Sequence, residues 1–248
     1  MDPMLGWLSV IFFLIAILYA SVGFGGGSSY TAMLALFGVS VGWIPLLSLS
    51  CNIVVVAGGC WHFYKRGYLN PRFVGSFLVG SVPMAFLAGT VEIASGVYIK
   101  LLALSLFAAA LMLLLRPRVG DGDVRVCPLP VRLLVGGGLG ALSGLVGIGG
   151  GIFLAPILLL ARWASPKECA ATASGFILFN SFAGLAGQLT KPGVGDAFFM
   201  LPLLVLAVFL GGQIGSRLGS KVLPAVRIRQ ATACLILFVS VRLWLQQI

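Results

Sequence analysis

Gly23-Phe24-Gly25-Gly26-Gly27 interrupts an apolar stretch near the start of the chain, and Gly147-Ile148-Gly149-Gly150-Gly151 interrupts another in the second half. Glycine at this density weakens a helix, by about 1 kcal/mol per residue relative to alanine. Within a membrane, broken backbone persists only where protein buries it or where it lines a water-filled cavity. Two such breaks at matching places in two halves are typical of a transporter's substrate site.

The composition around these runs is that of a membrane protein. Of the 248 residues, 60% are hydrophobic and 9% are charged, and the mean hydropathy is +1.11. Soluble proteins carry far more polar and charged surface. Apolar stretches long enough to cross a bilayer recur along the chain. The first of them is expected to stay in the mature protein, because no basic residue precedes it.

The chain reads as two copies of one unit. We expect a first repeat over residues 1–115, a cytoplasmic linker over 116–130 and a second repeat over 131–248. Each repeat divides into five apolar pieces, which cover residues 4–20, 28–40, 44–63, 73–91 and 97–115, and then 131–146, 152–162, 167–189, 197–216 and 228–245.

The second piece of each repeat is about a dozen residues long, too short to span a hydrocarbon core of about 30 Å. The first two pieces of a repeat then form either a hairpin that turns at the glycines inside the membrane or two short tilted crossings. Further on, Ser165-Pro166-Lys167-Glu168 predicts the start of a helix through a capping box with proline at the first helical position.

Basic residues indicate how the pieces cross. If all pieces alternate in direction, one side of the membrane receives all 16 Lys and Arg residues except Lys100, Lys191 and Arg242. If the first two pieces of each half formed one crossing, giving four crossings per half, the Lys and Arg residues would divide almost evenly between the two sides of the membrane. Because cytoplasmic loops carry the excess of Lys and Arg, alternation is favoured. The sequence therefore predicts an all-α polytopic protein of the inner (plasma) membrane, built from two inverted-topology repeats, with both termini outside.

The backbone at each glycine run suits an anion. The N–H groups that begin the pieces at 28–40 and 152–162 lack partners within the helix and lie at the positive end of its dipole. Glycine also lets an oxyanion approach the backbone closely. The alternative is that the glycines serve close helix packing. The candidate substrate ligands from the two runs are Gly25, Gly26, Gly27, Ser28, Ser29, Gly149, Gly150 and Gly151.

Three polar residues outside the runs are further candidates. Asn52 and Asn180 fall at matching positions of the two repeats once a four-residue insertion near 165 is allowed. A buried amide either faces a substrate or ties helices together, and the symmetric placement favours the substrate. Arg217 is the member of a basic cluster nearest the apolar interior. The alternative role of that cluster is to set topology and to meet lipid headgroups.

The remaining titratable residues argue against other function classes. The six acidic residues lie at segment ends or in loops, His62 lies at a segment end, and the five cysteines lack metal-ligand spacing. We therefore expect no catalytic site, no metal, no cofactor and no enzyme activity. The net charge of +10 suits anionic lipid rather than nucleic acid. The expected partners are a small anionic substrate and membrane lipid, with a coupling ion (sodium or a proton) and a homodimer left open.

Three features carry a resemblance to a known family: the Gly-x-Gly-Gly-Gly runs at 23–27 and 147–151, the piece that holds Asn180, and the segment 212–219 before a basic loop and a last helix. In these the chain resembles the TauE/SafE family of sulfite-exporter-like membrane permeases. One departure is Pro83, where the repeat places Gly215.

The resemblance implies transport of sulfur-containing anions, namely sulfite, an organosulfonate or thiosulfate. An interior-negative potential drives anions outward by about 2.3 kcal/mol per charge per 100 mV, so export needs no coupling ion. We expect a secondary transporter that exports such an anion by alternating access. The alternatives are an anion channel for similar ligands and, less simply, a membrane enzyme.

Overall fold

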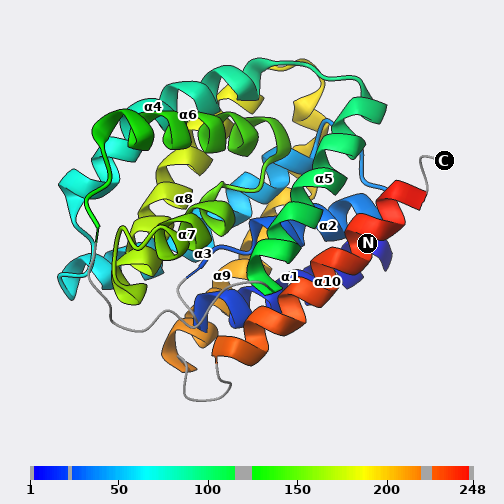
Figure 1. The fold of residues 1–248 in the computed structure, drawn as a ribbon. Coiled ribbons are helices and arrows are strands. Elements are labelled where there is room, and N and C mark those ends of the chain that lie inside the picture. Colours follow the sequence, from blue (N-terminus) through cyan, green and yellow to red (C-terminus); the bar gives the residue numbers. More distant parts are fainter. Residues whose placement is uncertain (1–2, 22–23, 115–124, 219–224, 246–248) are drawn as a thin grey trace.

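The computed structural model describes residues 3–21, 24–114, 125–218 and 225–245, and the regular structure in these ranges is entirely helical (Figure 1). Six of the helices are long and apolar enough to cross a membrane. The expected all-α polytopic membrane protein is thus confirmed for the described part of the chain. Residues 116–124 of the expected linker, Gly23 of the first glycine run and the extreme termini lie outside the described ranges.

The helices follow the expected pieces closely. The first half contains α1 (Pro3–Ser21), α2 (Gly27–Leu36), α3 (Ile44–Lys65), α4 (Pro71–Thr90) and α5 (Ser95–Leu114). The second half contains α6 (Leu129–Val146), α7 (Gly151–Leu160), α8 (Pro166–Gln188), the 3-10 helix η1 (Val194–Phe199), α9 (Leu201–Leu218) and α10 (Ala225–Leu245).

Local chemistry sets several of these boundaries. The capping box expected before α8 is present, because the Ser165 side chain accepts from the Glu168 N–H and the Glu168 carboxylate accepts from the Ser165 N–H. Asn70 caps α4 with its side chain alone, whose oxygen accepts from the N–H groups of Arg72 and Phe73. These caps end the loops at defined residues and so fix where the helices begin.

Each major contact between two helices has a counterpart between the corresponding helices of the other half. Helix α4 packs on α6 as α9 packs on α1, and α4 packs on α8 as α9 packs on α3. Likewise α2 lies on α3 as α7 lies on α8, whereas α3 meets α8 and α5 meets α10 across the middle. Such paired contacts are what two related halves produce, and they support the repeat. The inverted direction of the two halves across a membrane stays a prediction.

Glycines outside the two breaks serve close packing between these helix pairs. A Cβ added to Gly140 on α6 would overlap the carbonyl oxygen of Ser81 on α4. In the matching pair, a Cβ on Gly215 of α9 would overlap the carbonyl oxygen of Ile17 on α1. Small residues let the two backbones approach, which is how helices associate in a membrane.

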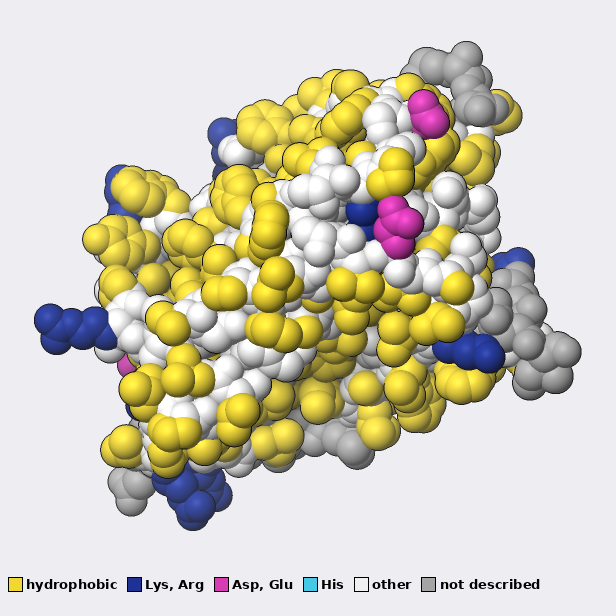
Figure 2. Space-filling view, turned by 90° about the horizontal axis from the view of Figure 1, so that it is seen from above, with side chains coloured by type: hydrophobic (Ala, Val, Ile, Leu, Met, Phe, Trp, Pro, Cys, Tyr) yellow, Lys and Arg dark blue, Asp and Glu magenta, His cyan; other side chains and the backbone are white. Residues whose placement is uncertain are grey.

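The outer surface suits lipid. Seen from above the view of Figure 1, it is covered by hydrophobic side chains, and Lys and Arg side chains lie mostly toward its edges (Figure 2). Large exposed apolar residues occur on several helices, among them Trp7, Val79, Leu104 and Leu134. A water-soluble monomer rarely exposes so much apolar surface.

Candidate functional site

Both glycine runs break the helices, as the sequence predicts. Residues 24–26 separate α1 from α2, and residues 147–150 separate α6 from α7. Within the second break, Gly147, Gly149 and Gly150 have φ angles of 83°, 84° and 73°. Residues that have a side chain rarely adopt this left-handed backbone conformation, so glycine is required at these positions.

The two breaks, which are far apart in the sequence, lie against each other. A Cβ added to Gly27 would lie 2.5 Å from the carbonyl oxygen of Ile148. The hydroxyl of Ser48 on α3 donates to the carbonyl oxygens of Gly27 and Gly147, at 3.1 and 2.9 Å. One side chain thus joins the broken segments of both halves. We call residues 25–27 and 147–151 the glycine crossing.

Asn52, one turn after Ser48 on α3, also lies in the glycine crossing. Its side chain is fully buried, and its Nδ2 lies 3.4 Å from the Ile148 carbonyl oxygen. A Cβ on Gly25 would lie 2.7 Å from Asn52 Oδ1. This oxygen finds no hydrogen-bond partner in the described structure. A rise of 1.5 Å per residue puts Asn52 about 12 Å along a helix of about 33 Å, well inside the bundle.

Helix α8 brings Ser181 to the glycine crossing from the other half. A Cβ on Gly149 would lie 3.4 Å from Ser181 Oγ, which is buried and has no partner among the described residues. Asn180 is buried too, but its Nδ2 donates within α8 to the Phe176 carbonyl at 2.8 Å, and its Oδ1 is unpartnered there. The described contacts of Asn180 thus do not join it to the glycine crossing as those of Asn52 do.

Ser28, Ser29 and Arg217 have other surroundings. The two serine hydroxyls hydrogen-bond Tyr19 of α1, at 3.4 and 2.9 Å, and both residues are buried. Arg217 is exposed in the last turn of α9, and no described contact brings it to Asn52. The structure therefore brings Gly25, Gly27, Gly149 and Asn52 together. The hydroxyls of Ser28 and Ser29 bond Tyr19 instead.

The starts of α2 and α7 are buried and lack side-chain caps. Gly26 and Gly150 occupy the N-cap positions, and neither helix has a side-chain hydrogen bond at its cap. The first N–H groups of both helices are therefore oriented donors at the positive ends of two dipoles. Gly26 itself lies toward Tyr30 and Ile15, since an added Cβ would lie 2.7 and 2.9 Å from their side chains.

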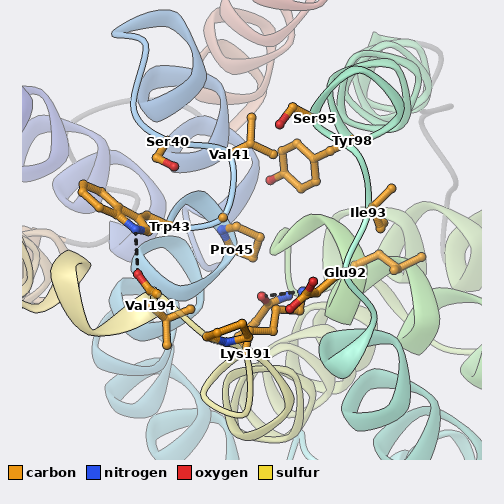
Figure 3. Close-up of a pocket in the computed structure, with 15 residues that line it drawn as sticks. Ser40, Val41, Trp43, Pro45, Glu92, Ile93, Ser95, Tyr98, Lys191 and Val194 are labelled. Atoms are coloured by element: carbon orange, nitrogen blue, oxygen red, sulfur yellow. Dashed lines mark hydrogen bonds between the residues drawn. The ribbon is translucent and has the colours of Figure 1, made fainter.

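A cavity of about 410 Å³ adjoins the second break (Figure 3). Pro45 forms part of its lining, and a Cβ on Gly147 would lie 2.5 Å from the Pro45 Cα. Tyr98, another lining residue, donates its hydroxyl to the Val146 carbonyl at 3.0 Å. The cavity is thus one layer of residues away from the glycine crossing. Its remaining lining comes from Ser40, Val41, Gly42, Trp43, Glu92, Ile93, Ser95, Leu145, Gln188, Lys191, Pro192, Gly193 and Val194.

Sequence reasoning missed Ser48, Ser181 and Lys191 as site residues. The first two had a usable signal, because Ser48 lies one helical turn before Asn52 and Ser181 directly follows Asn180. Lys191 had one as well, as one of three basic residues assigned to the side otherwise poor in Lys and Arg. That these residues lie near one another depends on helix packing, which periodicity alone does not give.

Comparisons with known proteins agree with this architecture. The model of the family described as sulfite exporter TauE/SafE matches residues 8–243. A probable membrane transporter protein of Sinorhizobium fredii is 34% identical over 240 residues, which cover 95% of this chain and 96% of that protein. A probable membrane transporter protein of Methanocaldococcus jannaschii is 26% identical over 233 residues, with 88% and 87% covered. No solved structure matches the chain.

Proposed function

Because this chain belongs to the sulfite exporter TauE/SafE family, we propose that it exports a small sulfur-containing oxyanion across the inner membrane through the glycine crossing. Membrane transport itself follows from the family and from the two relatives. The substrates that we expect are sulfite, an organosulfonate or thiosulfate.

The meeting of the two breaks is the observation that carries this proposal. Each half contributes an uncapped helix start, at Gly27 and at Gly151, and Ser48 holds the two breaks together. Two positive helix ends at one buried place favour a negatively charged ligand. The absence of side chains on the glycines lets the oxygens of such a ligand reach the N–H groups.

The unpartnered oxygen of Asn52 has a complementary role in this proposal. Oδ1 accepts hydrogen bonds and cannot donate one, so it suits a water molecule, the proton of a singly protonated anion or a coupling sodium ion. Backbone carbonyls at helix breaks coordinate such ions in other transporters. Comparing transport with and without sodium, and at different pH values, separates these three roles.

The packing is compatible with alternating access. The contacts between α4 and α6 and between α1 and α9 join elements of different halves, and Ser48 on α3 reaches the break of the other half. A rocking motion of the bundle of α4, α6, α7 and α8 against the bundle of α1, α2, α3 and α9, each of which contains helices of both halves, would change the Ser48 contacts and open the glycine crossing to one side at a time.

Ligand-dependent unfolding of the purified protein tests the proposal. The probes are sulfite, thiosulfate, taurine and sulfoacetate, with chloride as the control anion, each with and without sodium. We expect at least one sulfur anion to raise the unfolding temperature, since a ligand at 100 times its Kd stabilises a protein by about 2.7 kcal/mol. The same anion should then show slow, saturable flux in proteoliposomes. No response to any of these anions, or large single-channel currents, would contradict the proposal.

A further inference from the structure

We propose that the cavity beside Lys191 is a second anion site, in which Lys191 binds a small anion on its way between the glycine crossing and one face of the protein. This inference rests on the proposed function, and it adds a binding residue that the glycine runs do not reveal. We refer to the space of about 410 Å³ described above as the Lys191 cavity.

The Lys191 cavity is assembled from both halves of the chain. Its lining comes from the connections before α3, before α5 and after α8, and Figure 3 shows Trp43, Tyr98, Glu92 and Lys191 around one central space. The volume exceeds that of a water molecule by about an order of magnitude, which leaves room for a small hydrated anion. Apolar walls and a few polar groups are typical of small-molecule sites.

Lys191 supplies the positive charge. Among the described residues that line the Lys191 cavity it is the only cation, and its side chain is half-buried. Its Nζ donates to Gln188 Oε1 at 2.9 Å, and no carboxylate of the described chain lies within ion-pair distance of it. A half-buried ammonium group with a neutral partner has its charge available for an anion, and such charge-assisted hydrogen bonds are the stronger ones.

Gln188 fixes the position of this lysine and connects it to the second break. The Gln188 side chain is fully buried, and its Nε2 donates to the Gly144 carbonyl at 2.7 Å. Gly144 lies in the last turn of α6, three residues before Gly147. The chain of contacts therefore runs from Lys191 through Gln188 to the end of the helix that breaks at the glycine crossing.

Two helix starts add to the positive potential. Helix α3 begins at Ile44, between the lining residues Trp43 and Pro45, without a side-chain cap, and α5 begins at Ser95, which also lines the Lys191 cavity. These starts bring two positive dipole ends to the Lys191 cavity, whereas the ends of α6 and α8, at the lining residues Leu145 and Gln188, bring negative ones. The hydroxyls of Ser40 and Ser95 are further donors in the lining.

The negative charge of Glu92 opposes the positive charge of Lys191. Removing one charge or the other should therefore change anion binding in opposite directions. Its carboxylate also lines the Lys191 cavity, and it acts on Lys191 from beyond ion-pair distance. Burial lowers the pKa of Lys191, and the nearby charge of Glu92 raises it. Removing the Glu92 charge should therefore make the Lys191 cavity more attractive to an anion, whereas removing the Lys191 charge should make it less so.

Anion-dependent unfolding of purified variants, with sulfite as the probe, tests this inference. We expect Lys191→Gln to raise the sulfite Kd obtained from the stabilisation about tenfold, as the loss of one charge-assisted hydrogen bond would, and Glu92→Gln to lower this Kd severalfold. Lys100→Gln is the matched control, because Lys100 is an exposed lysine on α5 that does not line the Lys191 cavity. Lys100→Gln should leave the sulfite Kd unchanged.

The outcomes separate this inference from the proposed function. A wild-type protein that responds to sulfite, together with an unchanged sulfite Kd in K191Q, overturns the second site and leaves the proposed function standing. An equal loss in K191Q and K100Q overturns it as well, because it would indicate net charge rather than a site. A wild type that responds to none of the sulfur anions overturns both. Should K191Q fail to fold, Lys191→Arg and Glu92→Gln decide, since the first should keep the response and the second should strengthen it.

Discussion

Ser48 is the residue that ties the two halves together at the glycine crossing. Its hydroxyl donates to one carbonyl of each break, and the carbonyl of Gly27 also accepts from Thr31 at 2.9 Å. A single hydroxyl that bonds both breaks adds to stability in the state observed, and in the proposed alternating access its contacts would have to rearrange.

We expect Ser48→Ala to lower the free energy of unfolding by about 1–2 kcal/mol, because the buried Gly147 carbonyl loses a partner. Ser50→Ala is the matched control, since the Ser50 hydroxyl bonds only the Leu46 carbonyl of its own helix. Thermal unfolding in detergent measures both variants. Equal shifts in the two would contradict a bridging role for Ser48.

Residue-scale contacts were the hardest part to predict. The sequence predicts Asn52 and the glycines as a site, and the structure brings Asn52 together with Gly25, Gly27 and Gly149. The sequence does not predict that the hydroxyls of Ser28 and Ser29 bond Tyr19. Neighbours along the chain follow from helical geometry, whereas the helix that a hydroxyl faces depends on packing across the bundle.

The proposed function depends on the glycine-broken helices, and α7 shows most clearly why glycine is needed at a break. Its N-cap Gly150 has a φ of 73°, and an added Cβ would lie 2.8 Å from the Phe176 ring and 3.1 Å from the Leu139 carbonyl oxygen. A side chain there would combine left-handed strain, which costs about 1–3 kcal/mol, with overlap. The helix start would have to move away from the glycine crossing.

We expect Gly150→Leu to abolish anion flux while the protein still inserts into the membrane, and Gly26→Leu to do the same because its Cβ would overlap Tyr30. Gly138→Leu is the control, since a Cβ at this position on α6 has no neighbour within 4 Å. Flux in proteoliposomes and the yield of membrane-inserted protein are the readouts. Normal flux in both site variants would rule out the glycine crossing as the pathway.

At the element scale the sequence predicts the helices and their ends well, because prolines, glycines and capping residues mark where helices begin and end. The piece expected at 167–189 is α8 (Pro166–Gln188), and the short piece expected at 152–162 is α7 (Gly151–Leu160). The piece expected at 197–216 starts too early, because residues 197–199 belong to η1 and α9 begins only at Leu201. Those residues are as apolar as the helix that follows, so hydropathy does not separate them, although Pro202 marks the true start.

At the scale of the whole molecule, the paired contacts of the two halves give a structural reason for the duplicated sequence. Helices α1 and α9 pack as α6 and α4 do, and the breaks of both halves meet in the interior. Figure 1 also places the ends of α1 and α10 that carry the termini at the same end of the bundle. If the halves are inverted, a rocking motion in one direction would open the buried site to one side of the membrane, and the equivalent motion in the other direction would open it to the opposite side.

Topology reporters test this inversion. We expect a periplasmic alkaline phosphatase fused after the last residue to be active, and the same reporter inserted in the 116–130 segment to be inactive. A fluorescent protein that folds only in the cytoplasm should give the reverse pattern. Identical results at the two positions would show that the halves are not inverted, because an odd number of crossings must separate the two sites.

The most direct test of the account is to locate a bound anion at the glycine crossing. Selenite is a heavier oxyanion of the same pyramidal shape as sulfite, and its selenium gives an anomalous signal in a crystal of the protein. We expect a selenium peak within hydrogen-bond reach of the first N–H groups of α2 and α7 and beside Asn52. Selenite that occupies only surface positions, with the glycine crossing empty at saturating concentration, would contradict the account.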